Sequence, residues 1–113
     1  MSVVLYHNPK CSTSRNALAL LREQGVEPTV VEYLKTGWDR ETLARLASKT
    51  DLELSGLLRK KEADAKALLD AGADDEAILA AAIAQPILIE RPIVETDKGA
   101  VIGRPVERVL EIL

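Results

Sequence analysis

Residues 3–16 read VVLYHNPKCSTSRN, and this stretch decides the fold. The β-branched apolar run at its start is typical of a strand, and the Asn-Pro pair after it is typical of a turn. The hydroxyl residues that follow favour the start of a helix. The stretch therefore predicts a strand, a loop and a helix. Cys11, the only cysteine of the chain, is expected at or just before the first turn of that helix.

The position of Cys11 favours a reactive thiol. Unpaired backbone N–H groups and the helix dipole stabilise negative charge at a helix N-terminus, so a thiol there ionises more easily. The neighbours Lys10, Ser12 and Arg15 are polar or cationic and do not resemble a hydrophobic core. A lone cysteine is, however, often a small buried apolar residue. The local sequence therefore leaves two interpretations open, an attacking thiolate and an inert core residue.

The length and composition set limits on the class of protein. A chain of 113 residues suits a single domain with its own hydrophobic core, and we expect one domain over residues 1–113. One cysteine excludes an internal disulfide, and one histidine beside it supplies too few ligands for a zinc site, so we expect no bound metal or cofactor.

The charge and hydropathy of the chain bear on its partners. The net charge of −3 argues against nucleic-acid binding, although a locally positive pocket for a small anion is compatible with it. No basic leader and no run of ~20 apolar residues is present. We therefore expect a cytoplasmic protein with no membrane contact.

The residues after Cys11 predict a βαβ unit. A helix that begins near Ser12 ends at Gly25, and residues 29–34 read as a second strand. A helix of ordinary length between two strands makes the strands parallel, with a right-handed crossover.

Residues 39–85 read as a helical insertion beside the sheet. Asp39 suits the N-cap of a helix that reaches about Lys49, and three acidic residues at 74–76 suit another helix start. The helical segments that we expect in between and after are residues 54–58, 63–71 and 77–84.

The last part of the chain predicts a β-hairpin and a helix. Strands at 93–96 and 100–103 flank a turn, and Pro105 fits the first position of the closing helix. The order β-α-β, helical insertion, β-β-α predicts an α/β protein with a mixed four-stranded sheet, as in thioredoxin-like folds.

Two Arg-Pro pairs flank the predicted hairpin. Proline holds the preceding residue in extended geometry, so Arg91 before Pro92 and Arg104 before Pro105 have defined backbone positions. The start and the end of a hairpin lie at the same end of a sheet, so we expect the two arginines to be neighbours. Guanidinium groups match oxyanions in geometry and charge. The alternative is that each arginine pairs with a nearby acid such as Glu90 or Glu107.

Two further residues allow more than one interpretation. His7 lies at the end of the first strand, where it could act as a proton partner for the Cys11 thiol, or could be bonded to backbone; we favour the second. Arg59 lies in the run Arg59-Lys60-Lys61 and, taken alone, reads as part of a solvated basic cluster.

These motifs resemble the ArsC family, the glutaredoxin-coupled arsenate reductases of the thioredoxin-like superfamily. The resemblance rests on four stretches that together span nearly the whole chain, with a highly specific combined spacing. They are residues 6–16 (YHNPKCSTSRN), 57–60 (LLRK), 86–94 (PILIERPIV) and 102–105 (IGRP).

The resemblance implies a function and a set of site residues. It implies that Cys11 is the nucleophile, that Arg59, Arg91 and Arg104 hold the arsenate oxyanion, and that Pro92 follows a cis peptide bond beside the site. The supporting residues that lie in the same motifs are His7, Asn8, Ser14 and Pro92. The resemblance further implies glutathione as co-substrate and glutaredoxin as the reducing partner, and we expect a monomer.

Two positions depart from the family pattern, and two other functions stay open. Ser12 stands where well-studied members tend to have glycine, and Lys10 replaces a small residue. One alternative is another glutathione-dependent thiol oxidoreductase. The other is an Spx-like regulator that binds RNA polymerase without catalysis, although the redox switch of such regulators is Cys-X-X-Cys and residue 14 here is serine.

Overall fold

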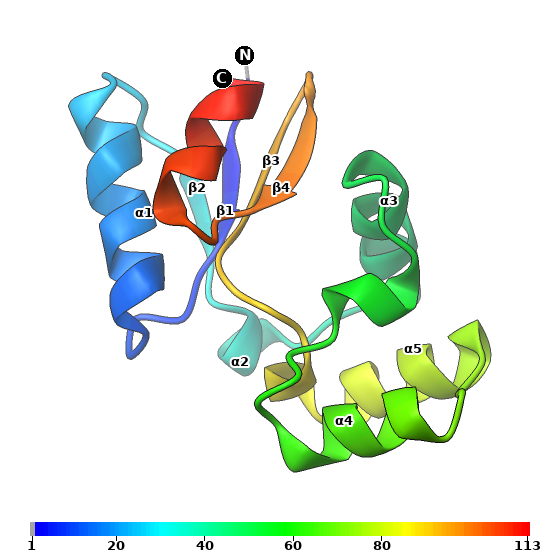
Figure 1. Ribbon diagram of the computed structural model, residues 1–113. Helices are drawn as coiled ribbons and strands as arrows, with labels where there is room; N and C mark the ends of the chain where they lie inside the picture. The colour runs from blue at the N-terminus through cyan, green and yellow to red at the C-terminus, as the bar shows by residue number, and fades with distance from the viewer. Residues whose placement is uncertain (1) are drawn as a thin grey trace. The chain divides into compact units, whose positions relative to one another are not determined.

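The computed structural model describes residues 2–113, which divide into two compact units (Figure 1). The sheet unit is made of the residues up to Thr36 and of Arg91–Leu113, and the helical unit is made of Gly37–Glu90. Within residues 2–113, no helix is both long enough and apolar enough to cross a membrane.

The sheet unit contains a mixed four-stranded sheet in the order β2-β1-β3-β4. Its strands are β1 (Val4–Tyr6), β2 (Thr29–Val31), β3 (Ile93–Thr96) and β4 (Gly99–Ile102). β1 pairs with β2 in parallel and with β3 antiparallel, and β3 pairs with β4 antiparallel. The predicted α/β fold with a thioredoxin-like mixed sheet is confirmed.

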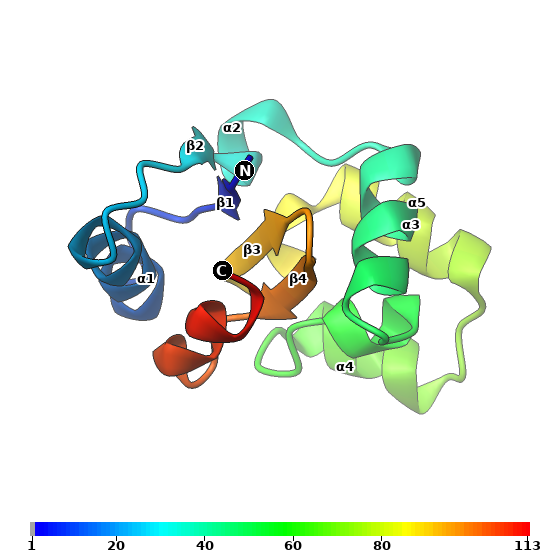
Figure 2. The same cartoon turned by 90° about the horizontal axis from the view of Figure 1, so that it is seen from above.

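One face of this sheet carries the hydrophobic core of the unit. Helix α1 (Ser12–Glu23) and the 3₁₀ helix η3 (Val106–Ile112) lie on the same side of the sheet (Figure 2). Leu5 and Val94 of the sheet pack with Ala17 and Leu21 of α1 and with Val109 of η3, all of them fully buried. Burial of each of these valine and leucine side chains stabilises the unit by roughly 1.5–3 kcal/mol, and burial of the smaller alanine by less. This packing fixes the N-terminus of α1, and hence Cys11, relative to the strand ends.

Strand β2 is shorter than the sequence predicted. It ends at Val31, and Tyr33–Thr36 forms the short helix α2 instead of extending the strand to residue 34. The carbonyl of Glu32 accepts hydrogen bonds from the amides of Lys35 and Thr36, which closes a helical turn. Gly37, with a φ of 75°, then ends the turn in the left-handed conformation that glycine adopts readily.

The last helix also differs in detail from the prediction. Pro105 has an extended backbone with a ψ of 161° and is the N-cap, so the helix begins at Val106 and not at the proline. Gly103, just before, lies close to neighbouring side chains. A Cβ there would come within 3.0 Å of Pro92 Cγ and 3.1 Å of Val109 Cγ1. The absence of a Cβ at Gly103 lets the chain approach Pro92 closely here without displacing these side chains.

The helical unit contains the predicted helices with nearly the predicted bounds. They are α3 (Arg40–Lys49), η1 (Leu54–Leu57), α4 (Ala63–Asp70) and α5 (Asp75–Ala84). A further short 3₁₀ helix, η2 (Pro86–Leu88), was not predicted. Asp39 Oδ1 accepts from the Thr42 amide at 2.7 Å, and Asp74 Oδ1 accepts from the Ala77 amide at 2.9 Å, so both aspartates cap helices. An isolated antiparallel β-bridge joins Leu58, in the middle of the unit, to Ile89 near its C-terminal end.

Candidate active site

Cys11 is the N-cap residue of α1, as the sequence predicts. Its backbone is extended, with φ −96° and ψ 122°, and its carbonyl accepts from the amide of Arg15 at 3.0 Å. Its own amide donates to the carbonyl of Asn8 at 3.0 Å, which closes the loop between β1 and α1. The side chain is partly exposed and forms no disulfide. The thiol is therefore not an inert part of the core.

The two arginines of the Arg-Pro pairs are neighbours beside this thiol, as the hairpin predicts. Nε of Arg104 donates to the carbonyl of Arg91 at 2.7 Å, and Nη2 of Arg104 lies 3.4 Å from Cys11 Sγ. The Arg91 side chain is 9% exposed and also donates a hydrogen bond to the Cys11 sulfur. Two cationic side chains thus approach one sulfur atom from the end of the hairpin.

Pro92 and Gly103 place these arginines. Pro92 directly follows Arg91, and Gly103 directly precedes Arg104, at the open end of the hairpin. The amide of Gly103 donates to the carbonyl of Pro92 at 2.8 Å. The Arg91–Pro92 peptide bond is cis, as the resemblance implies. The Arg104–Pro105 bond is cis as well, which no feature of the sequence indicated.

The surroundings of Cys11 lower the pKa of its thiol. Partial burial raises the pKa, but the backbone amide of Ser14 and the side chain of Arg91 donate hydrogen bonds to the sulfur, and the charges of Arg104 and Arg91 stabilise the thiolate. The net effect is a thiol pKa below its ordinary value. Since the thiolate is the nucleophilic form, the site favours attack by Cys11.

This lowered pKa predicts the pH profile of Cys11 alkylation. The alkylation rate should stay high at pH values where an ordinary thiol has lost its reactivity, and should fall only as the pH drops through the lowered pKa. The measurement is the rate of iodoacetamide alkylation against pH, with the urea-unfolded protein as reference. Arg104→Ala should move the midpoint upward. A wild-type midpoint equal to that of the unfolded protein would contradict the expectation.

Ser14 holds the loop before Cys11 by its side chain. Its hydroxyl is fully buried, accepts from the Asn8 amide at 3.1 Å and lies 2.6 Å from Nδ1 of His7. Burial lowers the pKa of His7; the charge of Glu32 opposes this effect, and those of Arg15 and Arg22 add to it. A neutral imidazole can accept a hydrogen bond from the hydroxyl at Nδ1. The His7 side chain is therefore bonded to a serine side chain, and the predicted bond from it to backbone is wrong.

Replacing Ser14 with alanine should destabilise the protein. The change leaves the Asn8 amide and the Nδ1 of His7 without this partner, and both residues are buried. We expect a loss of about 1–3 kcal/mol in the free energy of unfolding. Urea denaturation measures it. The matched control is Ser12→Ala on the same helix turn, where the side chain is exposed and the change should stay within about 0.5 kcal/mol. Equal losses in the two variants would contradict this role of Ser14.

Arg15 is a residue of the site region whose contact sequence reasoning missed. Its Nη1 donates to the carbonyl of Pro9 at 2.9 Å, which ties the loop to the first turn of α1. In the sequence, the only indication of this contact is that Arg15 follows Cys11 by four residues and so lies on the same side of the helix.

Arg59 belongs to the helical unit, and there its surroundings differ from the expected solvated cluster. Its side chain is only 13% exposed, and Nη1 lies 2.8 Å from Oε1 of Glu90. Its backbone amide donates to the carbonyl of Leu88 at 2.7 Å. Lys60 and Lys61 are exposed, so only the lysines fit the description of a solvated cluster. A role of Arg59 in oxyanion binding stays a prediction.

The fold and the site define a class of protein: a thioredoxin-like domain with one activated cysteine at a helix N-terminus and two arginines beside it. The chain belongs to the ArsC family, whose pattern matches residues 6–112.

Individual relatives are similar over nearly the whole chain. The arsenate reductase of Rhizobium meliloti (strain 1021) is 44% identical over 115 residues, which cover 100% of this chain and 82% of that protein. The uncharacterised protein YfgD of Escherichia coli (strain K12) is 46% identical, with 98% of this chain and 96% of that protein covered. Among solved structures, an arsenate reductase from Vibrio cholerae has a TM-score of 0.92 and 50% identity, with 100% and 98% covered.

Proposed function

We propose that this protein reduces arsenate to arsenite with Cys11 as the nucleophile. The observation that carries the proposal is the position of Cys11 Sγ at the N-terminus of α1, 3.4 Å from Nη2 of Arg104 and beside Arg91, which together lower the pKa of the thiol. A thiolate and an oxyanion repel each other, so their reaction needs nearby positive charge. The relatives named arsenate reductases support arsenate as that oxyanion.

The arginines are the residues that bind the arsenate oxyanion in this proposal. Arg104 has Nη2 beside the sulfur while its Nε is occupied by the Arg91 carbonyl, so the guanidinium is oriented by the backbone. Guanidinium groups bind tetrahedral oxyanions through paired N–H donors, which a lysine cannot reproduce. In this proposal Arg91 and Arg104 bind the arsenate oxygens, and Arg59 adds a third guanidinium contact.

Attack by Cys11 forms the first covalent intermediate. The thiolate sulfur bonds to arsenic, and one arsenate oxygen leaves as water after it takes up two protons. The product is a Cys11–S–As(V) adduct in which arsenic is not yet reduced. Arg91 and Arg104 offset the negative charge that gathers on the remaining oxygens during this step.

Reduction of As(V) to As(III) takes two electrons, and the chain has only one cysteine. A second thiol must therefore come from another molecule, for which we propose glutathione. Its thiolate attacks the Cys11 sulfur, an S–S bond forms, and the electron pair of the S–As bond stays on arsenic, which leaves as arsenite. Glutaredoxin then attacks the Cys11–glutathione disulfide and restores the Cys11 thiolate. We place this cycle in the cytoplasm, where the glutathione pool keeps thiols reduced.

The test is arsenite release by the purified protein. We expect arsenite when arsenate, glutathione and glutaredoxin are all supplied, and its loss when glutathione is left out. Separation of arsenite from arsenate by chromatography with mass detection measures the product directly. No arsenite in the complete mixture would overturn the proposed function.

A further inference from the structure

A cavity lies in the sheet unit beside the loop that carries Cys11. Its volume is about 220 Å³, and it is lined on one side by residues 7–10 of the loop and on the other by Glu32, Leu34 and Lys35 of the segment that follows β2. Lys10, which lines the cavity, is the residue immediately before Cys11 in the chain, while Cys11 itself is not one of the lining residues.

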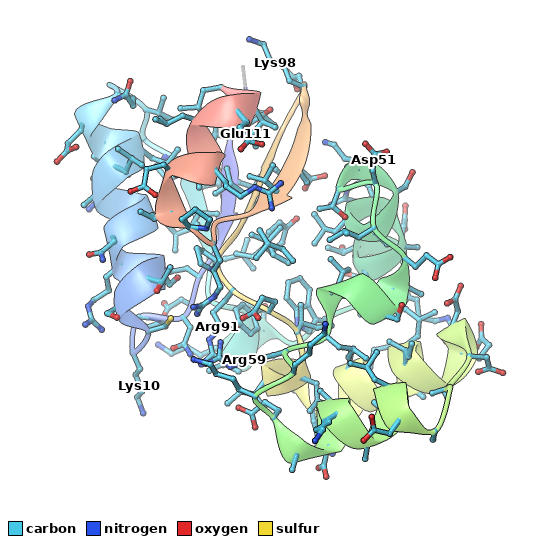
Figure 3. The ribbon with its side chains drawn as sticks, viewed as in Figure 1. Lys10, Asp51, Arg59, Arg91, Lys98 and Glu111 are labelled. Atoms are coloured by element: carbon cyan, nitrogen blue, oxygen red, sulfur yellow. The ribbon has the colours of Figure 1, made fainter. Side chains whose placement is uncertain are left out.

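The charged side chains around this cavity are arranged for a ligand with both signs of charge. Lys10 and Lys35 are exposed and bring two ammonium groups, while Glu32 brings one carboxylate. The Lys10 side chain extends from the loop away from the ribbon (Figure 3). Nζ of Lys35 lies 3.6 Å from Glu32, but the lysine side chain is 78% exposed, so this ion pair is weak and a ligand can replace it.

The cavity also has an apolar part. Leu34 is 40% exposed and lines the cavity together with Pro9. An apolar surface flanked by a few charged groups is typical of small-molecule sites. The volume lies below the ~300–1,000 Å³ of sites that enclose a whole ligand, so it suits one arm of a short peptide.

We propose that this cavity binds the thiol co-substrate, a small zwitterionic peptide of which glutathione is the example, next to Cys11. The inference rests on the proposed function for the reaction that it serves. A carboxylate of the peptide lies at Lys10 and Lys35, its ammonium group faces Glu32, and its chain lies on Leu34 and Pro9. The peptide sulfur then points to the Cys11 sulfur.

Disulfide exchange tests this binding without arsenate. The Cys11 thiolate attacks one sulfur of a disulfide, forms a mixed disulfide, and releases the other sulfur as a thiolate. The rate is measured by intact-protein mass for two disulfides, oxidised glutathione and its fully esterified form, in which the carboxylates are blocked. We expect wild type to react about tenfold faster with the free acid.

The variants are Lys10→Glu and Lys35→Glu, with Lys98→Glu as the matched control. Lys98 belongs to the same unit and has the same change of charge, but it lies at the opposite end from Lys10 (Figure 3). The preference for the free acid should disappear in the first two variants and stay within about twofold of wild type in the control. The ratio of the two rates removes any effect of the substitutions on the reactivity of the thiol itself.

A substitution that does not alter the charge distinguishes binding of the peptide in the cavity from a general attraction of anions to the protein surface. Leu34→Ser should slow the reaction with oxidised glutathione about fivefold, and leave the small neutral hydroxyethyl disulfide unaffected. No slowing by Leu34→Ser, or a preference that survives both lysine substitutions, would overturn the proposed site. A wild type that shows the preference but releases no arsenite would overturn the proposed function and leave this site intact.

Discussion

Cys11→Ser is expected to lower arsenite release at least about 10³-fold, to the level of the assay without protein. The serine hydroxyl has nearly the same shape but does not ionise near neutral pH, so the helix N-terminus and the arginines have no thiolate to stabilise. The chain has no other cysteine, so no second thiol can take over the attack.

The measurement is the initial rate of arsenite release with glutathione and glutaredoxin present, at several arsenate concentrations. Ser12→Ala is the control, because Ser12 is the next residue of the chain and its side chain is exposed. It should retain activity close to wild type. Circular dichroism should show the same fold for all three proteins. Substantial arsenite release by Cys11→Ser would show that Cys11 is not the nucleophile.

Arg104→Ala and Arg91→Ala are expected to lower kcat/KM for arsenate by about 10²–10³-fold each. Each change removes one guanidinium from the sulfur and from the place where negative charge gathers during attack. The same variants should raise the pKa of the Cys11 thiol, because both charges and the Arg91 hydrogen bond lower it in wild type. Arg104→Lys keeps the charge but loses the paired donors, so we expect an intermediate rate.

The control for these variants is Arg22→Ala, since Arg22 lies on α1 with a side chain that is 55% exposed and pairs with Glu27. Its activity should stay within about twofold of wild type. Because Arg91 is buried, urea denaturation should accompany its activity measurement, and Arg104, which is more exposed, gives the cleaner comparison. Wild-type kcat/KM in Arg104→Ala would exclude this arginine from oxyanion binding.

The elements of the sheet unit could be predicted because local and long-range signals agree. The loop at Asn8-Pro9, the helix stop at Gly25 and the hairpin turn each fix a local boundary. That Arg91 and Arg104 are neighbours could be predicted because they flank the two paired strands of one hairpin, and this pairing depends only on adjacent segments of the chain. The end of β2 could not be predicted, because the aromatic Tyr33 and the apolar Leu34 follow Val31 as they would in a strand, while the Glu32 carbonyl already closes a turn.

The contacts that complete the site depend on tertiary structure, which the spacing of residues does not reveal. The pair between Ser14 and His7 joins the first turn of α1 to the end of β1, and its existence depends on how the loop between them folds. The pair between Arg59 and Glu90 joins residues separated by 31 positions and forms beside the Leu58–Ile89 bridge. Nothing in the Arg-Lys-Lys run distinguishes its first member from the two exposed lysines.

The contact of Gly103 with Pro92 has a consequence for the thermodynamics of anion binding. It closes the end of the hairpin, and the Arg91 carbonyl then holds Nε of Arg104. An arginine side chain that is mobile before binding loses rotamer entropy when it grips a ligand, typically about 0.5–1.5 kcal/mol. Here part of that loss has already occurred on folding. The hairpin thus acts as a preorganised anion receptor. The entropy cost of ordering Arg104 lowers the free energy of unfolding of the sheet unit instead of the affinity for the anion.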